Sequence, residues 1–239
     1  MIETLSETGS TNAELVARLT RGELLREGDW LVADRQSAGR GRQGREWFDG
    51  AGNFMGSTVV HAAFGDPPFA SLALVAGLSL IEAVSPRIPP PSRAMLKWPN
   101  DLMIGGAKLA GVLLERVGDA VVIGIGVNLA SAPQLADRET IALSALGPSP
   151  DRDHFAQELA RSFAADLVRW RNFGLAPVMA RWQVAAYPAG TLLAVGEPGE
   201  LPLSGTFAGL SDDGALLLRL ADGTTRVINA GEVRLAGEH

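Results

Sequence analysis

The sequence predicts an α/β (α+β) protein in which a large domain of strands and helices precedes a small all-β unit. Residues 69–84 are apolar nearly all round at helical spacing, which predicts a buried helix. Residues 94–129 carry strand patterns separated by tight turns and predict an antiparallel meander. From Thr191 onward, short strand patterns alternate with Asp-Gly turns. We therefore expect two domains, at 1–186 and 187–239.

The other elements of the large domain follow from the same periodicities. A short helix is expected at 13–20, because good N-cap residues stand directly before it. Strand patterns occupy 29–36 and 53–64. An apolar stripe of phenylalanine, leucine and tryptophan predicts an amphipathic helix at 151–173, and a shorter helical piece follows at 175–183.

Composition excludes several classes of protein. The 239 residues are 46% hydrophobic and 20% charged, which is typical of a globular chain. A net charge of −6 disfavours general binding to nucleic acid. The absence of cysteine excludes disulfides, thiolate zinc sites and a cysteine nucleophile. The N-terminus lacks a signal-peptide layout and no apolar run reaches the ~18 residues of a membrane span, so we expect a cytoplasmic protein without membrane partners.

The stretch GRGRQGREW, residues 39–47, formally contains the dinucleotide fingerprint G-x-G-x-x-G. That fingerprint requires an apolar helix directly afterwards, and REWFDGAGN is not a helix pattern. A nucleic-acid patch and a plain solvated loop stay open as alternatives. We favour a glycine-rich loop that closes over an anionic ligand. Glycines let a backbone approach closely, and arginine forks bind phosphate or carboxylate.

Three further segments support a ligand site: KWPND (97–101), KLAGVLLE (108–115) and GIGVN (124–128). Each is weak alone. Lys97 and Lys108 also suit solvated strand ends. Other residues of the set also have a structural interpretation that needs no ligand. The tryptophans at 47 and 98 could be core residues, Asn128 could cap a turn, and Asp101 could cap the hairpin.

Taken together and in this order, the segments GSTNAEL, DRQSAGRGRQGREW, KWPNDLMIGGAKLAGVLLE and VIGIGVNL resemble the biotin protein ligases, also called biotin–[acetyl-CoA-carboxylase] ligases. The strong match covers about residues 8–129, and LAPVMARW and GALLLRLADGTTRVINAGEV match more loosely. The resemblance implies a catalytic domain with a mixed β-sheet, shared with lipoate ligases, and a small C-terminal SH3-like β-barrel. The chain is similar to the ligase-only form, which has no N-terminal winged helix.

The resemblance implies an ATP-dependent enzyme that forms biotinyl-5′-AMP and passes biotin to a lysine of a biotin carboxyl carrier protein. Attack of a carboxylate on the α-phosphate brings two anions together, so the site must neutralise charge. The residues expected to do so are Arg40, Arg42, Arg45, Lys97 and Lys108, and of these Lys108, Arg40, Arg42 and Lys97 are expected to be catalytic. A Mg²⁺ ion is expected at Asp101 with help from Asn100. Lys108 is also expected to stabilise the oxyanion of the transfer step; no base for the acceptor lysine is evident.

The same resemblance assigns the binding residues. Those expected to bind biotin are Ser10, Thr11, Asn12, Gln36, Arg40, Gly41, Arg42, Lys108 and Gly111. Those expected to bind ATP or the adenylate are Arg42, Arg45, Trp47, Lys97, Asn100 and Asn128. Neutral donors and acceptors suit the ureido ring of biotin. Loop 39–47 is expected to shield the adenylate from water when it closes.

Alternatives and departures stay in view. A lipoate or octanoate ligase is the first alternative, a non-enzymatic biotin- or nucleotide-binding regulator the second, and a DNA-binding repressor the third. Phe54 and Met55 stand where the family commonly has a Leu-Tyr pair, and Ala236 stands where an arginine is common. We expect a monomer or homodimer that does not bind nucleic acid.

Overall fold

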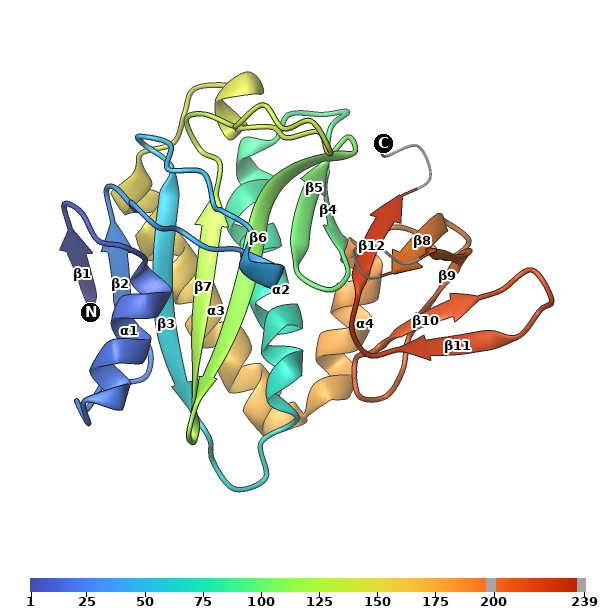
Figure 1. Cartoon of the computed structure of the whole chain (residues 1–239), viewed down its shortest axis with the longest axis horizontal. Coiled ribbons are helices and arrows are strands. Elements are labelled where there is room, and N and C mark those ends of the chain that lie inside the picture. Colours follow the sequence, from blue (N-terminus) through green and yellow to red (C-terminus); the bar gives the residue numbers. More distant parts are fainter. Residues whose placement is uncertain (197–200, 236–239) are drawn as a thin grey trace.

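The computed structural model describes residues 1–196 and 201–235, so the expected departure at Ala236 lies outside the described residues. Two β-sheets dominate it, a large one carrying four helices and a small one formed by the C-terminal strands (Figure 1). The prediction of an α/β protein with a small all-β unit is confirmed.

The large sheet has seven strands in the order β1-β2-β3-β7-β6-β5-β4. Their bounds are β1 (Ile2–Leu5), β2 (Trp30–Ala33), β3 (Phe54–His61), β4 (Ala94–Lys97), β5 (Asp101–Ile104), β6 (Ala107–Val117) and β7 (Ala120–Val127). The strands β4 to β7 form the predicted meander. Among the seven described strands of this sheet only β1 and β2 pair in parallel, joined by a helical crossover, so the sheet is mixed as the resemblance implies. The strand β1 is an addition that the sequence pattern does not predict.

Helices cover both faces of this sheet. They are α1 (Thr11–Thr20), α2 (Leu72–Val84), α3 (Arg152–Phe173) and α4 (Leu175–Ala185). The helix α1 lies on one face, and α2 and α3 lie on the other (Figure 1). Successive strand side chains alternate between these faces: on β3, Val59 joins the small apolar cluster under α1, and Val60 joins the main core.

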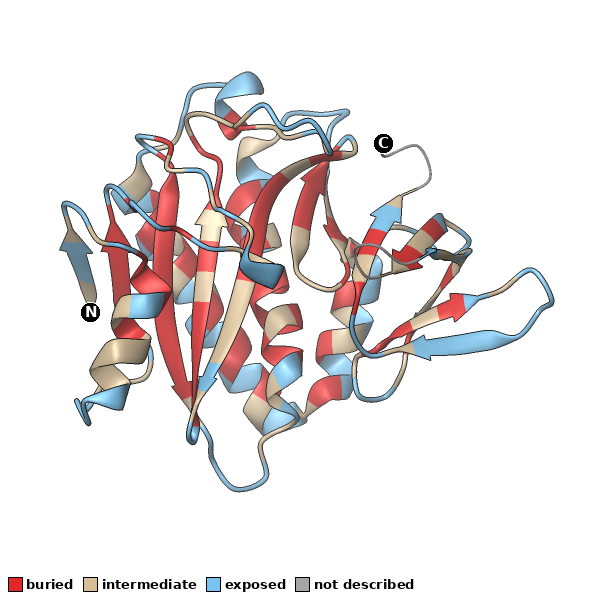
Figure 2. Ribbon diagram, viewed as in Figure 1, coloured by how far each residue is buried: buried red, intermediate tan, exposed pale blue. Residues whose placement is uncertain are grey.

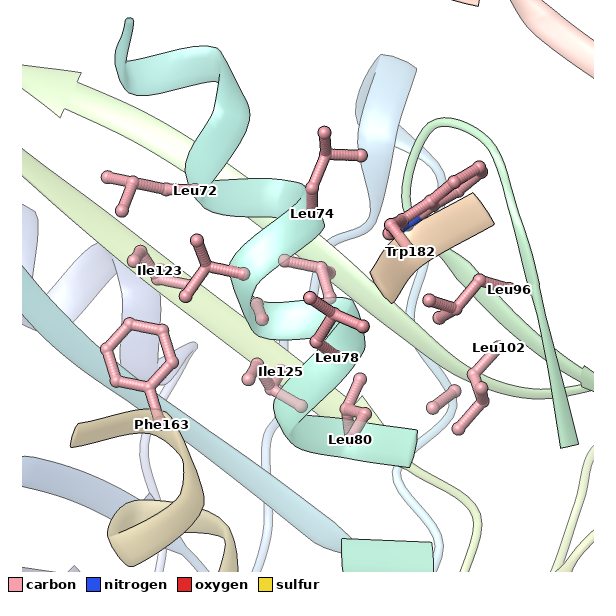
Figure 3. Packing of buried hydrophobic residues seen from close by; sticks show 14 of the residues in the cluster. Leu72, Leu74, Leu78, Leu80, Leu96, Leu102, Ile123, Ile125, Phe163 and Trp182 are labelled. Carbon is pink, nitrogen blue, oxygen red and sulfur yellow. The ribbon is translucent and has the colours of Figure 1, made fainter. Parts of the chain in front are cut away.

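The main core surrounds α2. The helix predicted at 69–84 begins with a 3₁₀ turn at Phe69–Ser71 and becomes α-helical at Leu72. Leu72 and Leu78 pack among side chains of β7, α3 and α4 (Figure 3). The segment Phe69–Arg87 is long and apolar enough to span a membrane by length and composition, but most of it is buried inside the protein (Figure 2). It is therefore a core helix.

The C-terminal strands form an antiparallel sheet in the order β11-β10-β9-β8-β12. Their bounds are β8 (Leu192–Gly196), β9 (Leu203–Leu210), β10 (Leu216–Arg219), β11 (Thr225–Ile228) and β12 (Glu232–Leu235). The expected barrel closure is wrong for the described residues, since β11 and β12 are edges that do not pair with each other. Closure requires strands to tilt and stagger by a fixed amount, and residue patterns do not encode that.

The small sheet packs directly against the large domain. Trp98 Nε1 donates to the carbonyl oxygen of Gly214 at 3.1 Å, and the rings of Trp182 and Phe207 meet edge to face. Apolar residues of both sheets belong to one continuous core, as expected for a sheet too small for a deep core of its own. A boundary between 186 and 187 stays a prediction.

Candidate active site

An open cavity of about 830 Å³ lies on the α1 face of the large sheet. Its walls come from the start of α1, loop 39–47, the strands β4 to β7, the segment 133–140 and β12. Segments from both ends of the chain and from the middle therefore meet at one place. A cavity of this size suits a ligand as large as a nucleotide.

The floor of the cavity is bare main chain. A Cβ atom at Gly124 would lie 2.2 Å from Asn12 Oδ1, and one at Gly126 would lie 2.2 Å from Trp47 Cε2. Gly111 faces Gly126 across β6 and β7, and a Cβ there would lie 3.2 Å from both Trp47 Cζ3 and Lys108 Nζ. The side chains of Asn12, Trp47 and Lys108 can therefore pack against the main chain only because these three positions have no Cβ. This close approach accounts for both glycines of GIGVN.

A cation cluster lies at one end of the floor. The KWPND turn joins β4 to β5 and sets Lys97 opposite Asp101. Lys108 Nζ lies 2.6 Å from Asp101 Oδ1, and Lys97 Nζ lies 4.0 Å from Asp101 Oδ2. Burial would raise the pKa of Asp101, but the charges of Lys108 and then Lys97 outweigh it and hold that pKa below its usual value. Asp101 is therefore a carboxylate that orients two lysines.

The arginines of loop 39–47 reach across the cavity. Arg42 Nη1 donates to Asn100 Oδ1 at 3.2 Å, and Arg42 Nη2 to the carbonyl oxygen of Gly231 at 3.4 Å. Arg45 Nη1 donates to Glu232 Oε1 at 2.8 Å, and this contact lowers the pKa of Glu232. Arg40 lines the cavity but is exposed. Two loop arginines are thus tied to the KWPND turn and to β12.

The other end of the cavity is polar and neutral. Ser10, Thr11, Asn12 and Gln36 are all buried there. Thr11 N donates to Gln36 Oε1 at 2.7 Å. Ser10 is the N-cap of α1, where its side chain accepts from Ala13 N. The cavity therefore has a cationic half and an uncharged hydrogen-bonding half.

Among the described residues, three buried polar atoms of the wall have no hydrogen-bond partner: Trp47 Nε1, Asn128 Oδ1 and Asp101 Oδ1, the last of which is ion-paired with Lys108. Asn128 Nδ2 is used structurally, since it donates to the carbonyl oxygen of Ile141 at 3.2 Å. Buried polar groups are seldom left unpaired in a native protein. A ligand in the cavity would supply the missing partners.

A model of the biotin/lipoate A/B protein ligase family matches residues 8–128, which is half of the chain. The chain belongs to this family. A model of the biotin protein ligase C-terminal domain matches residues 198–235. The resemblance identified from the motifs is thereby confirmed, and the looser C-terminal likeness with it.

Relatives within the family extend along the whole chain. The biotin–[acetyl-CoA-carboxylase] ligase of Paracoccus denitrificans is 38% identical over 98% of this chain and 100% of its own length. The ligase of the same name from Mycobacterium tuberculosis is 37% identical over 97% of this chain and 88% of its own. The structure of a biotin protein ligase from Aquifex aeolicus in complex with biotin and ATP superposes with a TM-score of 0.83 at 28% identity, covering 98% of this chain and 97% of that one.

The cavity brings together every residue that the family resemblance assigns to binding or catalysis. All of them line it, namely Ser10, Thr11, Asn12, Gln36, Arg40, Gly41, Arg42, Arg45, Trp47, Lys97, Asn100, Asp101, Lys108, Gly111 and Asn128. Their individual roles stay predictions.

Other residues of the site are not among those that the resemblance assigned. Glu232 and Arg138 also line the cavity, and Arg138 lies within electrostatic reach of both Glu232 and Asp101. Glu232 lies in GEV, the end of the C-terminal segment that resembles the family, and that likeness could have indicated a role for it. Arg138 lies in an irregular segment with no pattern that distinguishes it.

The donor set suits a magnesium ion only in part. Among the described residues no group of three or more acidic or histidine side chains comes together. Asp101 offers oxygen atoms, but they face Lys108 and Lys97. This fits a metal that is held mainly by the phosphates of ATP and meets one protein carboxylate. Asp101 as that ligand stays a prediction.

Changing Gly126 to alanine is expected to lower both stability and ligand binding, because the new Cβ would overlap the Trp47 ring. Overpacking of this kind typically costs about 1–3 kcal/mol. Thermal unfolding and equilibrium binding of biotin would measure the two effects. Gly147→Ala is the matched control, since nothing lies within 4 Å of its added Cβ. If the Trp47 ring causes the loss, Gly126→Ala in a Trp47→Ala background should not lower stability further; an equal loss would contradict this.

Proposed function

We propose that this chain is an ATP-dependent biotin–protein ligase, which joins biotin to a lysine of a biotin carboxyl carrier protein. The observation that carries the proposal is the division of one cavity into a neutral polar half and a cationic half. Biotin has a neutral ureido ring at one end and a carboxylate at the other. Such an acid would place its ring at Ser10, Thr11 and Gln36 and its carboxylate toward Lys108.

The first step would join the carboxylate to the α-phosphate of ATP with loss of pyrophosphate. Lys97, Lys108 and Arg42 would offset the repulsion between carboxylate and phosphate. Asp101 would hold the two ammonium groups in place, because its carboxylate lies between them. A magnesium ion at Asp101 would supply further neutralisation of the phosphates.

The second step would transfer the biotinyl group to the acceptor lysine and release AMP. Lys108 would donate a hydrogen bond to the acyl oxygen as negative charge develops there. The lysine nucleophile must lose a proton, and the phosphate of AMP is the acceptor that we propose for it. Loop 39–47, tied by Arg42 and Arg45, would keep water from the adenylate until the carrier arrives.

The runner-up is a lipoate or octanoate ligase with the same chemistry. The Thr11 hydroxyl and the Gln36 amide oxygen are buried and already hydrogen-bonded within the protein. A lipoyl or octanoyl tail would add no hydrogen bond to these side chains, whereas the ureido ring of biotin would add bonds worth about 0.5–1.5 kcal/mol each. The neutral half of the cavity therefore favours biotin.

The test is ATP–pyrophosphate exchange driven by biotin, with lipoate and octanoate measured in parallel. We expect exchange with biotin alone, followed by labelling of a carrier domain when one is added. Exchange with lipoate or octanoate instead would retain the mechanism and overturn the substrate. Absence of exchange with all three acids would contradict ligase activity. Because the reaction consumes ATP and its relatives are named for acetyl-CoA carboxylase, we propose a cytoplasmic location.

A further inference from the structure

A chain of hydrogen bonds runs behind the neutral half of the cavity. Asn12 Nδ2 donates to Glu115 Oε2 at 2.7 Å, and Asn12 Oδ1 accepts from Ser57 Oγ at 2.6 Å. Ser57 Oγ lies 2.7 Å from Thr11 Oγ1. Glu115 and Ser57 are not among the described residues that line the cavity, and no motif assigns them a role. The chain therefore joins the cavity wall to two residues behind it.

Glu115 determines which atom donates in each of these hydrogen bonds. An ionised carboxylate only accepts hydrogen bonds, so Asn12 must turn its NH₂ group toward Glu115. The oxygen of the Asn12 amide then faces Ser57 and takes the one hydroxyl proton of that serine. The direction of both bonds follows from the single fixed acceptor at Glu115.

The direction continues to Thr11. Two hydroxyl oxygens 2.7 Å apart need a proton between them, and Ser57 has already used its own. Thr11 must therefore donate to Ser57. Its oxygen also lies 3.1 Å from Gln36 Oε1, which could accept the same proton, but the single hydroxyl proton of Thr11 is required by the shorter contact with Ser57. The hydroxyl of Thr11 is thus left with lone pairs alone for a ligand.

Hydrogen-bond donors of Gln36 and Ser10 accompany the acceptor oxygen of Thr11. Since Gln36 Oε1 faces Thr11 N, the NH₂ group of Gln36 lies on the other side of its amide and can donate. Ser10 Oγ accepts a long bond from Ala13 N and keeps its own proton. A cyclic urea presents N–H donors on both sides of a carbonyl acceptor. The wall thus offers an acceptor for one ureido N–H and donors for the ureido oxygen.

The geometry points to Glu115 as a positioning residue, which acts through Asn12 and Ser57 to hold the Thr11 hydroxyl as an acceptor for a ureido N–H. The inference rests on the proposed function, because biotin is the acid that carries the ureido ring. Without Glu115, Asn12 can reverse its amide and release Ser57 and Thr11 to rotate. A Thr11 proton would then face a ligand proton, and the hydrogen bond would be lost.

The experiment measures KM for biotin and for ATP in biotin-driven exchange. Glu115→Ala is expected to raise KM for biotin roughly tenfold and to leave KM for ATP unchanged. Glu115→Gln keeps an acceptor oxygen in the same place and should restore the KM for biotin. A merely structural role would not separate the two substrates in this way. Equilibrium binding of biotin should weaken by the same factor.

A second variant tests whether the hydrogen bonds from Glu115 to Thr11 act as one unit. Ser57→Ala should raise KM for biotin as Glu115→Ala does, and the double variant should be no worse than either, because one broken link already frees Thr11. Glu7→Ala is the matched control, an exposed carboxylate near the start of α1 with kinetics expected to match the parent. If Glu115→Ala unfolds, Ser57→Ala and Glu115→Gln still decide the question.

The outcomes separate the two ideas. If the unaltered protein shows no biotin-driven exchange, both the proposed ligase function and the positioning role of Glu115 are overturned. Exchange by the unaltered chain together with an unchanged KM for biotin in Glu115→Ala would overturn the positioning role alone. A double variant whose KM equals the product of two separate effects would also overturn it, since that result requires two independent sites.

Discussion

Replacing Lys108 with methionine is expected to lower the rate of biotin-driven ATP–pyrophosphate exchange by about 10²- to 10³-fold. Lys108 lies at the cavity floor: its Nζ would be 3.2 Å from a Cβ at Gly111 and lies 5.8 Å from the centroid of the Trp47 ring. Its side chain is only 17% exposed, so its charge is weakly screened. Methionine has a similar length without the charge, and the loss therefore reports on the charge itself.

The control for this substitution must separate catalysis from folding. Lys108→Met leaves the Asp101 carboxylate beside Lys97 at 4.0 Å and without its partner at 2.6 Å, which lowers stability. Adding Asp101→Asn removes the uncompensated charge. The double variant should regain thermal stability and stay inactive. Recovery of exchange in the double variant would show that Lys108 serves only to neutralise Asp101.

The second large effect is expected from Arg42→Gly, which should label proteins other than the carrier. Arg42 ties loop 39–47 to Asn100 and to the carbonyl of Gly231. Loss of these charge-assisted bonds should release the proposed adenylate roughly ten- to a hundredfold faster. Free biotinyl-AMP acylates exposed lysines without selection. Streptavidin blots of a mixed lysate, and chromatography of released biotinyl-AMP, would measure the leak.

Gln43→Gly is the matched control for the loop. Gln43 lies in the same loop and has a φ of 58°, which glycine adopts without strain. The change removes the oxygen that accepts from Arg45 Nη2 at 3.1 Å, but it leaves the contacts of Arg42 with Asn100 and Gly231 and the contact of Arg45 with Glu232 in place. We expect Gln43→Gly to remain selective for the carrier. Equal stray labelling by both variants would show that loop flexibility, and not the arginine contacts, controls release.

Local patterns were sufficient for most of the large domain. The meander β4 to β7 and the helices α2 and α3 have strong periodicity or turn signals, and the structure confirms them. The four-residue edge strand β1 carries no comparable pattern, since only Ile2 and Leu5 are partly buried, and it exists because it pairs with β2. Barrel closure likewise depends on which distant strands pair, and among the strands that the structure describes β12 pairs with β8 alone.

The site divides in the same way. Gly124 and Gly126 sit in a strand, where glycine signals close approach of another group, and the structure shows Asn12 and Trp47 there. Glu115 ends the motif KLAGVLLE, but its partner Asn12 lies 103 positions away, and no spacing in the sequence predicts this pair. Contacts between segments far apart in sequence are set by the packed fold, so they become visible only in three dimensions.

The contact between Arg45 and Glu232 joins positions 187 residues apart. Loop 39–47 is synthesised before β12. At about 5–20 residues per second, roughly 10 to 40 s pass between them on the ribosome. A nascent chain that ends before Gly231 already has the glycine floor and Asn100, the partner of Arg42 in the KWPND turn. It lacks the carbonyl oxygen of Gly231 and the carboxylate of Glu232, so the contacts that join the loop to β12 form only after β12 has been made.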